Sequence, residues 1–402
     1  MKILVISNLF PPHALGGYEI LCAQICGILQ ERGHDIFVLT SDHRVTPDQE
    51  GQGQSKSAFD VHRSLKLYLP FGEPAALLRR RRHQVGKQNY RTAGDLIQRI
   101  KPDLVFIWSQ LRLTLGAARA CQDSGVPTAY TCNDDHLAGY LPAQLKASPR
   151  DWLRFIADRF IFPDITLRGL QLHHLTCISQ RLKTDLLARG LSIDNAKVIY
   201  QGIPVEQFPC KEKPGRINAP ARLLYVGQLH DYKGVHTLVE AAHRLAKPGT
   251  DVPLSVTIIG AGDQEYAARL KNLATGPAVV EFGGRVAHAE LPRIYREHDI
   301  FVFPSIWVEP FGLTHLEAMA SGTPVISTAH GGHGEFLRDG ENALVFEKEN
   351  SEQLAQQLMR VISDDKLSHH LAAEARAMVE RDFTLKRYAI DLESFLYQAR
   401  GE

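Results

Sequence analysis

The sequence contains no long hydrophobic run. No stretch of its 402 residues approaches the roughly eighteen consecutive apolar residues that a membrane-spanning helix requires. Its N-terminal run, ILVI at residues 3–6, is followed by polar residues and by Pro11-Pro12, without a small-residue cleavage site. This pattern indicates a buried first strand and not a signal peptide. We therefore expect a cytoplasmic protein, and peripheral contact with the inner face of a membrane stays open.

Cysteine and net charge are also scarce. The six cysteines form no C-x-x-C pair and show no regular spacing, which in a chain of this size favours buried reduced thiols over a disulfide framework. The formal net charge is only +1. Such a balance produces no overall field that would draw the protein to nucleic acid, so no nucleic-acid partner is expected and any basic patch must be local.

What the sequence does contain is an alternation of short hydrophobic strands and helical stretches. A chain of this length exceeds what one hydrophobic core usually supports, so two domains are expected. Buried strands separated by helices indicate a parallel sheet covered on both faces. In the first half the pattern predicts a helix at 17–32 and strands at 2–7, 35–40, 103–108, 127–132 and 174–179.

The alternation restarts after a polar segment that contains three prolines. Strands are expected within 221–229, 254–265, 278–286, 300–305 and 323–328, with helices at 234–247, 265–274 and 384–399. We predict an α/β fold of two Rossmann-like, doubly wound domains that face a cleft. The expected divisions are an N-terminal domain at 1–205, a linker at 206–219, a C-terminal domain at 220–383, and a helix at 384–402 that packs back on the N-terminal domain.

Two carboxylates bracket a strand-to-helix turn in EPFGLTHLE, residues 309–317. The first turn of a helix has unpaired N–H groups and a partial positive charge, and glycine lets an anion approach closely. Gly312, Leu313 and Thr314 therefore form a candidate phosphate cradle. Glu309 and Glu317 would accept hydrogen bonds from hydroxyls on either side of a diphosphate, an arrangement that suits a nucleotide-sugar. On spacing alone, surface acids remain the alternative.

A diphosphate site also needs fixed positive charge. Lys233 in VGQLHDYKG, residues 226–234, follows a strand and precedes a helix. A lysine there can act as a point charge that reaches an anion. A solvated lysine at a helix start is the alternative.

With these residues in place, the chain resembles the retaining GT-B glycosyltransferases of family 4. The resemblance covers nearly the whole length, and an ordered set of motifs is far more specific than a single glycine-rich turn. Its pieces are FPPHALGGYE (10–19), ISQRLK (178–183), VIYQGIP (198–204), YVGQLHDYKGVHTLVEA (225–241), IIGAGDQE (258–265), FGGRV (282–286), VFPSIWVEPFGLTHLEAMASGTPVIST (302–328) and GGHGEFLRDGENALVF (331–346).

The resemblance implies a transfer of sugar from a nucleotide-diphosphate sugar to an acceptor hydroxyl with retention, in glycan, polysaccharide or glycoconjugate synthesis. It implies no cofactor and no metal, an acceptor domain at 1–205 and a donor domain at 220–383. The acceptor itself, whether a glycan, a lipid-linked glycan or a small molecule, stays open. The implied catalytic residues are Glu309, Lys233 and Asn133, and the implied donor-binding residues are Gly16, Gly17, Gln228, Lys233, Gly260, Arg285, Val286, Glu309, Phe311, Gly312, Leu313, Thr314, Glu317 and Glu335.

Individual roles follow from the same resemblance. Glu309 would hold hydroxyls of the donor sugar, Glu317 the ribose, and Lys233 the diphosphate. Gly16 and Gly17 would let the backbone approach the donor phosphate and the acceptor. The pair 285–286 would lie beside the nucleotide base, and residue 335 on a loop that closes the site.

Two positions depart from the family pattern. Gln228 stands where the family usually has arginine, so one charged contact to the diphosphate is missing. Asn133 stands where the family often has histidine, and an amide cannot titrate near neutral pH. These departures keep a second hypothesis open, a catalytically degenerate nucleotide-sugar binding module. A glycoside phosphorylase or a nucleotide-sugar epimerase on a related fold is a third.

Three further features carry less specific signals. His330 and His333 near Glu335 lack strong metal-ligand spacing, so no metal site is expected. The RRRRH run at 79–83 indicates a solvated face, or contact with anionic lipid or a phosphorylated acceptor. The segment 148–171 interleaves Trp, Phe and Ile with Arg. We interpret it as a core helix with a charged face, and an amphipathic element on a membrane surface is the alternative.

Overall fold

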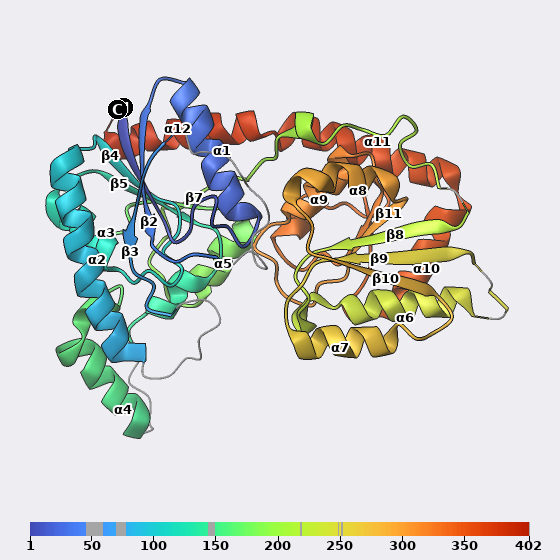
Figure 1. Ribbon diagram of the computed structural model, residues 1–402, viewed down its shortest axis with the longest axis horizontal. Helices are drawn as coiled ribbons and strands as arrows, with labels where there is room; N and C mark the ends of the chain where they lie inside the picture. The colour runs from blue at the N-terminus through green and yellow to red at the C-terminus, as the bar shows by residue number, and fades with distance from the viewer. Residues whose placement is uncertain are drawn as a thin grey trace. The chain divides into compact units, whose positions relative to one another are not determined.

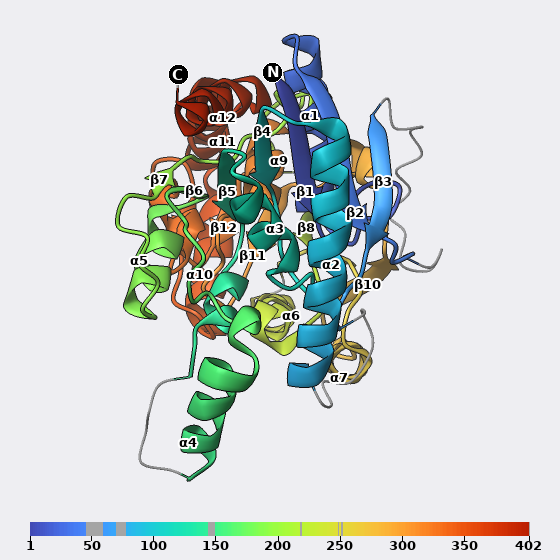
Figure 2. The ribbon, with the colours of Figure 1, turned by 90° about the vertical axis from the view of Figure 1, so that its left-hand side faces the viewer.

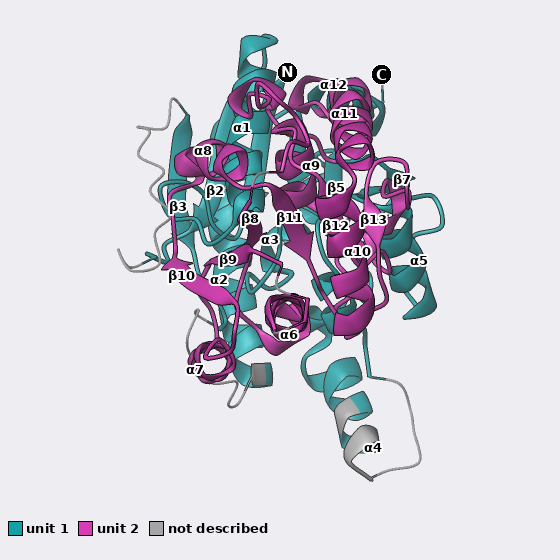
Figure 3. Ribbon diagram, turned by 90° about the vertical axis from the view of Figure 1, so that its right-hand side faces the viewer, with its two compact units in different colours: residues 1–200, 389–402 teal, residues 201–388 magenta. Residues whose placement is uncertain are grey.

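The protein folds into two compact units in the computed structural model, residues 1–200 with 389–402 and residues 201–388 (Figure 3). The structure describes residues 1–45, 59–69, 78–143, 149–217, 219–247, 249–250 and 252–401. Each unit is an α/β unit with one parallel sheet. No helix among these residues is both long and apolar enough to cross a membrane.

Unit 1, whose strands are blue to green in Figure 1, is built on a seven-stranded sheet in the order β3-β2-β1-β4-β5-β6-β7. The central strands β1 and β4 are buried on both faces, as their continuous Ile, Leu and Val runs require in a parallel sheet. The strands are β1 Lys2–Ser7, β2 Asp35–Ser41, β3 Asp60–Leu65, β4 Leu104–Ile107, β5 Thr128–Cys132, β6 His174–Cys177 and β7 Lys197–Val198. The α-helices that connect them are α1 Gly17–Glu31, α2 Leu78–Ile100, α3 Gly116–Ser124, α4 Pro149–Ile156 and α5 Gln180–Ala188.

Unit 2 repeats the same strand order with six strands, β10-β9-β8-β11-β12-β13. Its strands are β8 Ala221–Val226, β9 Leu254–Ile259, β10 Val279–Gly284, β11 Ile300–Phe303, β12 Val325–Ser327 and β13 Leu344–Val345. Its α-helices are α6 Val235–Ala246, α7 Gln264–Leu273, α8 Leu291–Glu297, α9 Leu313–Ala320, α10 Ser351–Ser363 and α11 Asp365–Asp382. All strands run parallel, and the order in which they are added reverses beside β8. The loops after β8 and β11 therefore meet at the carboxyl edge, where such sheets bind ligands.

The last helix, α12 Leu385–Arg400, starts in unit 2 and continues in unit 1 from Ala389 onward. Within unit 1, Glu393 accepts hydrogen bonds from the Arg32 guanidinium at 2.6 Å and from His34 Nε2 at 2.8 Å. These contacts lower the pKa of Glu393, the Arg32 contact having the largest effect. Residues 211–215 of the proline-containing segment bond to the turn after α9 through Ser321 O and Gly322 O.

Two sequence expectations need correction. The strand β3, DVHRSL, was not predicted, because its polar side chains at the sheet edge leave no hydrophobic run to find. The predicted segment 148–171, described from residue 149 onward, is not a core helix with a charged face. Its side chains of Trp152, Leu153, Phe160 and Ile161 are all more than half exposed, on α4 and the π-helical turn Ala157–Ile161 (η2).

Candidate active site

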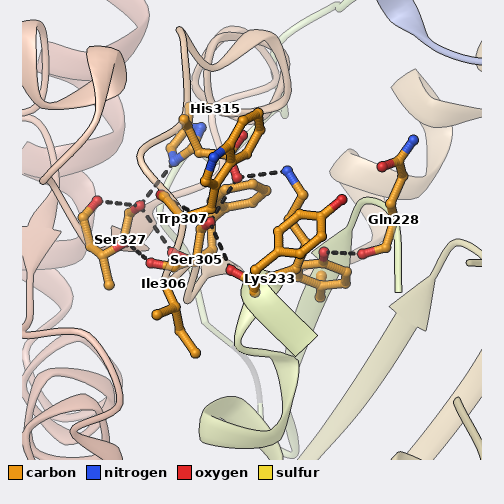
Figure 4. A network of polar contacts seen from close by, with 12 residues as sticks. Gln228, Lys233, Ser305, Ile306, Trp307, His315 and Ser327 are labelled. Atoms are coloured by element: carbon orange, nitrogen blue, oxygen red, sulfur yellow. Dashed lines mark hydrogen bonds and ion pairs between the residues drawn. The ribbon is translucent and has the colours of Figure 1, made fainter. Parts of the chain in front are cut away.

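The first two glycine turns of unit 2 lie against each other at the sheet edge. Gly260 has φ +142°, and a Cβ there would come within 1.8 Å of the Gly227 carbonyl oxygen. The Tyr225 hydroxyl donates to the backbone carbonyl of Gln228 at 2.8 Å. The Gln228 side chain itself is exposed and extends away from the polar network (Figure 4). The contact between turns thus depends on glycine, and leaves the Gln228 side chain outside the network.

Lys233 is held at the start of α6 by the turn around it. It closes the 3-10 turn Asp231–Lys233 (η5), and Gly234 follows at φ +64°, where a Cβ would lie 2.1 Å from Pro304 O. The Lys233 ammonium lies 4.9 Å from the Trp307 ring centre and 5.5 Å from that of Tyr232. Rings at such distances attract a cation. The positive charge of Lys233 is therefore both buried and held in one position by the surrounding rings.

Glu309 forms an ion pair with this lysine. Lys233 Nζ lies 2.6 Å from Glu309 Oε1, and the Ser305 hydroxyl donates to the same oxygen at 2.7 Å (Figure 4). Both charged side chains are about one-tenth exposed. The backbone of Glu309 is fixed as well, because Gly332 N–H donates to its carbonyl at 2.6 Å and a Cβ on Gly331 would lie 2.5 Å from it. A largely buried ion pair thus lies in the segment that leads into the next helix.

That helix, α9, begins at Gly312 in a conformation that only glycine adopts easily. Its φ is +156°, and a Cβ would come within 2.8 Å of His315 Nδ1. The amides of Leu313 and Thr314 are the first of the helix and have no intrahelical partner by geometry, whereas His315 N–H returns to Gly312 O at 3.1 Å. No acidic residue occupies the first turn. The helix start therefore offers positive potential without an internal carboxylate.

Behind the helix start, two buried histidine rings stack. The rings of His315 and His333 are 5.0 Å apart at 19°, and His315 Nε2 lies 2.9 Å from Ser327 Oγ. Burial lowers the pKa of both, that of His333 to about 4, and outweighs nearby carbonyl oxygens that favour the protonated ring. Neither ring nitrogen of His333 makes a hydrogen bond of ordinary length. Near neutral pH both rings are uncharged.

Glu317 lies one turn further along α9, and its own protein already engages both carboxylate oxygens. Tyr295 OH donates to Oε2 at 3.0 Å, and His288 Nε2 lies 3.1 Å from Oε1. Burial lowers the pKa of His288, but the carboxylate of Glu317 more than compensates, so the net shift is upward. A carboxylate has about four acceptor positions, so Glu317 retains capacity for a ligand hydroxyl.

The remaining predicted donor residues of unit 2 differ in exposure. Phe311 is buried against Phe336, with ring centres 5.5 Å apart, so it packs behind the helix start. Arg285, just after β10, is exposed and Val286 is half-buried. Glu335 ends the 3-10 turn Gly332–Glu335 (η7) and borders a cavity of about 150 Å³. Among the described residues, no group of three or more metal-ligating side chains gathers.

The predicted glycine turn of unit 1 is already occupied by a carboxylate. Gly16, extended at φ −154°, precedes α1, and its N–H donates to Glu19 Oε2 at 2.9 Å. Gly17 is the first residue of the helix. Glu19 is fully buried, and burial raises its pKa to about 7 despite hydrogen bonds that oppose the shift. The amide of Gly16 is thus committed to Glu19.

Asn133 follows β5 at the carboxyl edge of the unit 1 sheet. Its Nδ2 donates to Trp108 O at 2.8 Å, at the end of β4. The next residue, Asp134, accepts hydrogen bonds from the backbone and the ring of His136. Burial would raise the pKa of Asp134, but His136 outweighs it and the net shift is downward. An aspartate–histidine pair therefore lies beside the amide in this loop.

Sequence reasoning missed Glu19, Ser305, His288 and Tyr295 as members of these clusters. The capping pattern of Glu19, three residues after Gly16, was a usable signal, since such an acid commonly returns to the N-cap amide. No signal marks the others, because each meets its carboxylate only through the fold.

Two family models match the chain. The model described as Glycosyltransferase Family 4 matches residues 15–207, and the model described as Glycosyl transferases group 1 matches residues 209–378. Together they leave only the first 14 residues, residue 208 and the last 24 residues unmatched. The chain belongs to these glycosyltransferases. The predicted membership of the family 4 and group 1 type is confirmed, and the chain is an enzyme that transfers a glycosyl group.

A curated relative matches over the full chain. A glycogen synthase of Mycobacterium tuberculosis is 27% identical over all of this chain and 96% of its own length. A spore coat protein of Bacillus subtilis, SA, is 33% identical, but over 43% of this chain and 47% of its own length. These identities are compatible with the family and leave the substrate of the glycosyltransferase undetermined.

Solved structures confirm the GT-B fold. Anabaena HepE, in a complex with UDP and glucose, matches with a TM-score of 0.71 at 20% identity over 99% of both chains. Sucrose-phosphate synthase of Thermosynechococcus elongatus matches with a TM-score of 0.72 at 20% identity, over 99% of this chain and 98% of its own. The predicted pair of Rossmann-like domains is therefore correct as a fold class.

Proposed function

We propose that this glycosyltransferase moves a sugar from a nucleotide-diphosphate sugar to an acceptor hydroxyl with retention of anomeric configuration, in glycan, polysaccharide or glycoconjugate synthesis. The observation that carries the proposal is the Lys233–Glu309 ion pair of 2.6 Å, which lies nearly dry beside the glycine start of α9. A buried cation and a helix start with no acidic residue in its first turn together suit two phosphate groups.

In the proposed reaction the bond between the anomeric carbon and the diphosphate oxygen breaks. The acceptor oxygen bonds to that carbon, its proton leaves with the departing diphosphate, and a nucleoside diphosphate is released. Lys233 and the amides of Leu313 and Thr314 stabilise the charge that develops on the leaving group. Because these protein groups carry that charge, the proposal requires no metal and no cofactor.

Glu309 is proposed to hold hydroxyls of the donor sugar. Its Oε1 is bound by Lys233 and Ser305, which fixes the carboxylate and leaves its second oxygen to accept from a hydroxyl. Glu317 is proposed to hold the ribose, oriented by Tyr295. Arg285 and Val286 would lie beside the base, and Glu335 on the loop that closes over the donor.

Relatives support the choice of donor class. HepE has been solved with UDP and with UDP-glucose. By analogy with HepE, we propose that this chain also takes a nucleotide-sugar donor. Unit 1, with Gly16, Gly17 and Asn133, is proposed to handle the acceptor. Asn133 would donate or accept a hydrogen bond there but would not act as a base. We place the enzyme in the cytoplasm, with peripheral contact at the inner membrane face.

A turnover assay with a panel of nucleotide-sugars and acceptors tests the proposal. Glu309→Gln should lower transfer by ten- to a hundredfold, since a lost charged hydrogen bond in a closed site costs about 1.5–3 kcal/mol. Nucleoside diphosphate should still bind. The matched control is Glu352→Gln on α10, an exposed glutamate.

Two outcomes would overturn the proposal. Near-normal transfer by Glu309→Gln with donor in excess would remove Glu309 from the reaction. Nucleotide-sugar binding without turnover for any acceptor would instead favour the degenerate binding module that Gln228 and Asn133 leave open.

A further inference from the structure

Several exposed apolar residues of unit 1 lie on two consecutive helical segments. Of the ten large hydrophobic side chains that are exposed among the described residues, four lie on α4 and η2, namely Trp152, Leu153, Phe160 and Ile161. Their exposed fractions run from 55% to 70%. Figure 2 shows α4 projecting from the rest of unit 1 beyond the end of α2. We call these four side chains the apolar ridge.

Hydrogen bonds from two other parts of unit 1 anchor η2, which carries part of the ridge. The carboxylate of Asp158 in η2 receives two hydrogen bonds of 3.0 Å from the Arg79 guanidinium at the start of α2, and one from the Ala143 N–H at 3.0 Å. Asp158 is buried, so the paired acid adds little negative charge to the surface. η2 is thus anchored to unit 1, while the apolar side chains of the ridge remain exposed.

Positive charge borders the ridge. Arg159 is exposed, and its guanidinium lies 5.7 Å from the Phe160 ring centre and 5.9 Å from that of Phe155. Arg80 and Arg81, which follow Arg79 in the sequence of α2, are exposed too. Arg82 is different, since it packs over Tyr140 at 4.4 Å. Aromatic and aliphatic side chains flanked by arginines match the boundary between acyl chains and anionic headgroups.

We infer that the apolar ridge and the neighbouring arginines dock on a bilayer that contains anionic lipid. Trp152, Leu153, Phe160 and Ile161 would enter the boundary of the acyl chains, while Arg80, Arg81 and Arg159 contact the headgroup phosphates. This binding needs no turnover, so it stands or falls separately from the proposed reaction. It also deepens that proposal, because an acceptor presented at a membrane would lie within reach of unit 1.

Vesicle co-sedimentation of the full chain tests the inference. Vesicles of phosphatidylcholine with phosphatidylglycerol should retain the protein at low salt, and vesicles of phosphatidylcholine alone should retain much less. Replacing both Arg80 and Arg81 by Gln should weaken binding roughly fivefold for each arginine, with a smaller salt dependence. The matched control is Arg293→Gln with Arg296→Gln, two exposed arginines of α8 in unit 2.

The apolar part has its own variants. Replacing Trp152 and Phe160 by Ser should weaken binding to the anionic vesicles by at least about tenfold, whereas Val279→Ser, an equally exposed residue of β10, should leave it unchanged. Circular dichroism checks that each variant is folded. Trp152 emission should shift to the blue on vesicle addition and be quenched by brominated acyl chains, and Trp152→Phe should lose that signal but still bind.

Several results would overturn the inference. They are no retention by anionic vesicles at low salt, equal retention by neutral vesicles, or unchanged binding by the Trp152 and Phe160 double variant. Self-association in solution that the same double variant abolishes, without vesicle binding, would assign the ridge to a second copy of the chain.

Discussion

The starts of α1 and α9 look alike in sequence and differ in chemistry. Each helix begins after a glycine, Gly16 or Gly312, and each carries a buried ionisable side chain three residues later. In α1 that side chain is Glu19, whose carboxylate binds the Gly16 amide. In α9 it is His315, which burial keeps uncharged.

The difference indicates which helix start is available to a phosphate. A helix start favours an anion, and in α1 the Gly16 amide already donates to the carboxyl group of Glu19. The first turn of α9 contains no acid, and the carboxylate of Glu309, which precedes the helix, is paired with Lys233. We therefore propose that the diphosphate binds at the start of α9, and we expect the α1 turn to contribute shape more than charge.

The largest expected effect comes from replacing His333, which is buried behind the start of α9. Burial lowers the pKa of His333 from 6.5 to about 4. Its contribution to the free energy of unfolding is therefore fully present above pH 6.5 and is lost as the pH falls towards 4. The shift corresponds to about 3 kcal/mol. His333→Leu should reduce acid destabilisation by about that amount, measured as thermal unfolding from pH 4 to 8. An unchanged profile, matching that of exposed His369→Leu, would contradict it.

The contribution of Glu19 to the free energy of unfolding should depend on pH in the opposite direction, with a similar magnitude. Its folded pKa is raised from 4.5 to about 7, so its contribution is fully present below pH 4.5 and lost as pH rises through 7. Glu19→Gln can still accept from Gly16, and should remove a loss of about 3 kcal/mol between pH 4.5 and 7.5. Calorimetric unfolding at these pH values, beside exposed Glu31→Gln, checks it. A variant that loses stability at pH 7.5 would show that the charged acid is favourable.

Replacing the two glycines by alanine should have a somewhat smaller effect on stability. Gly312→Ala should lower the free energy of unfolding by about 1–3 kcal/mol, because its φ of +156° strains any other residue and a Cβ meets His315 Nδ1 at 2.8 Å. Gly16→Ala should cost under about 1 kcal/mol, since its nearest neighbour, Glu19 Oε2, is 3.6 Å from a Cβ. Urea unfolding of both proteins gives the two values, and equal costs would remove the distinction.

The smallest expected effect concerns Gln228. Gln228→Arg should tighten nucleoside diphosphate binding by about 1–2 kcal/mol, the value of one charge-assisted hydrogen bond. The exposed side chain has room to change. Isothermal titration measures the gain. Lower affinity in a folded variant would mean that Gln228 belongs to a reshaped donor pocket and does not mark a missing charge.

The fold could be predicted from the sequence because parallel strands buried on both faces are continuous hydrophobic runs, as at 2–7 and 300–303. The edge strand β3 could not, since polar side chains face solvent there. The motif at 309–317 indicated the correct helix start. Its ion pair with Lys233 joins residues 76 positions apart, and the stacking of His315 on His333 likewise depends on the fold, so neither contact has a local signal.

Titration of nucleoside diphosphates into the wild-type, Gly312→Ala and Gly16→Ala proteins tests the assignment of the diphosphate most directly. Thermal unfolding first establishes that each variant is folded at the titration temperature. We expect Gly312→Ala to lose affinity by at least about tenfold, the value of one charge-assisted contact, and Gly16→Ala to bind as the wild type does. Loss of binding in Gly16→Ala, with full affinity in Gly312→Ala, would contradict it.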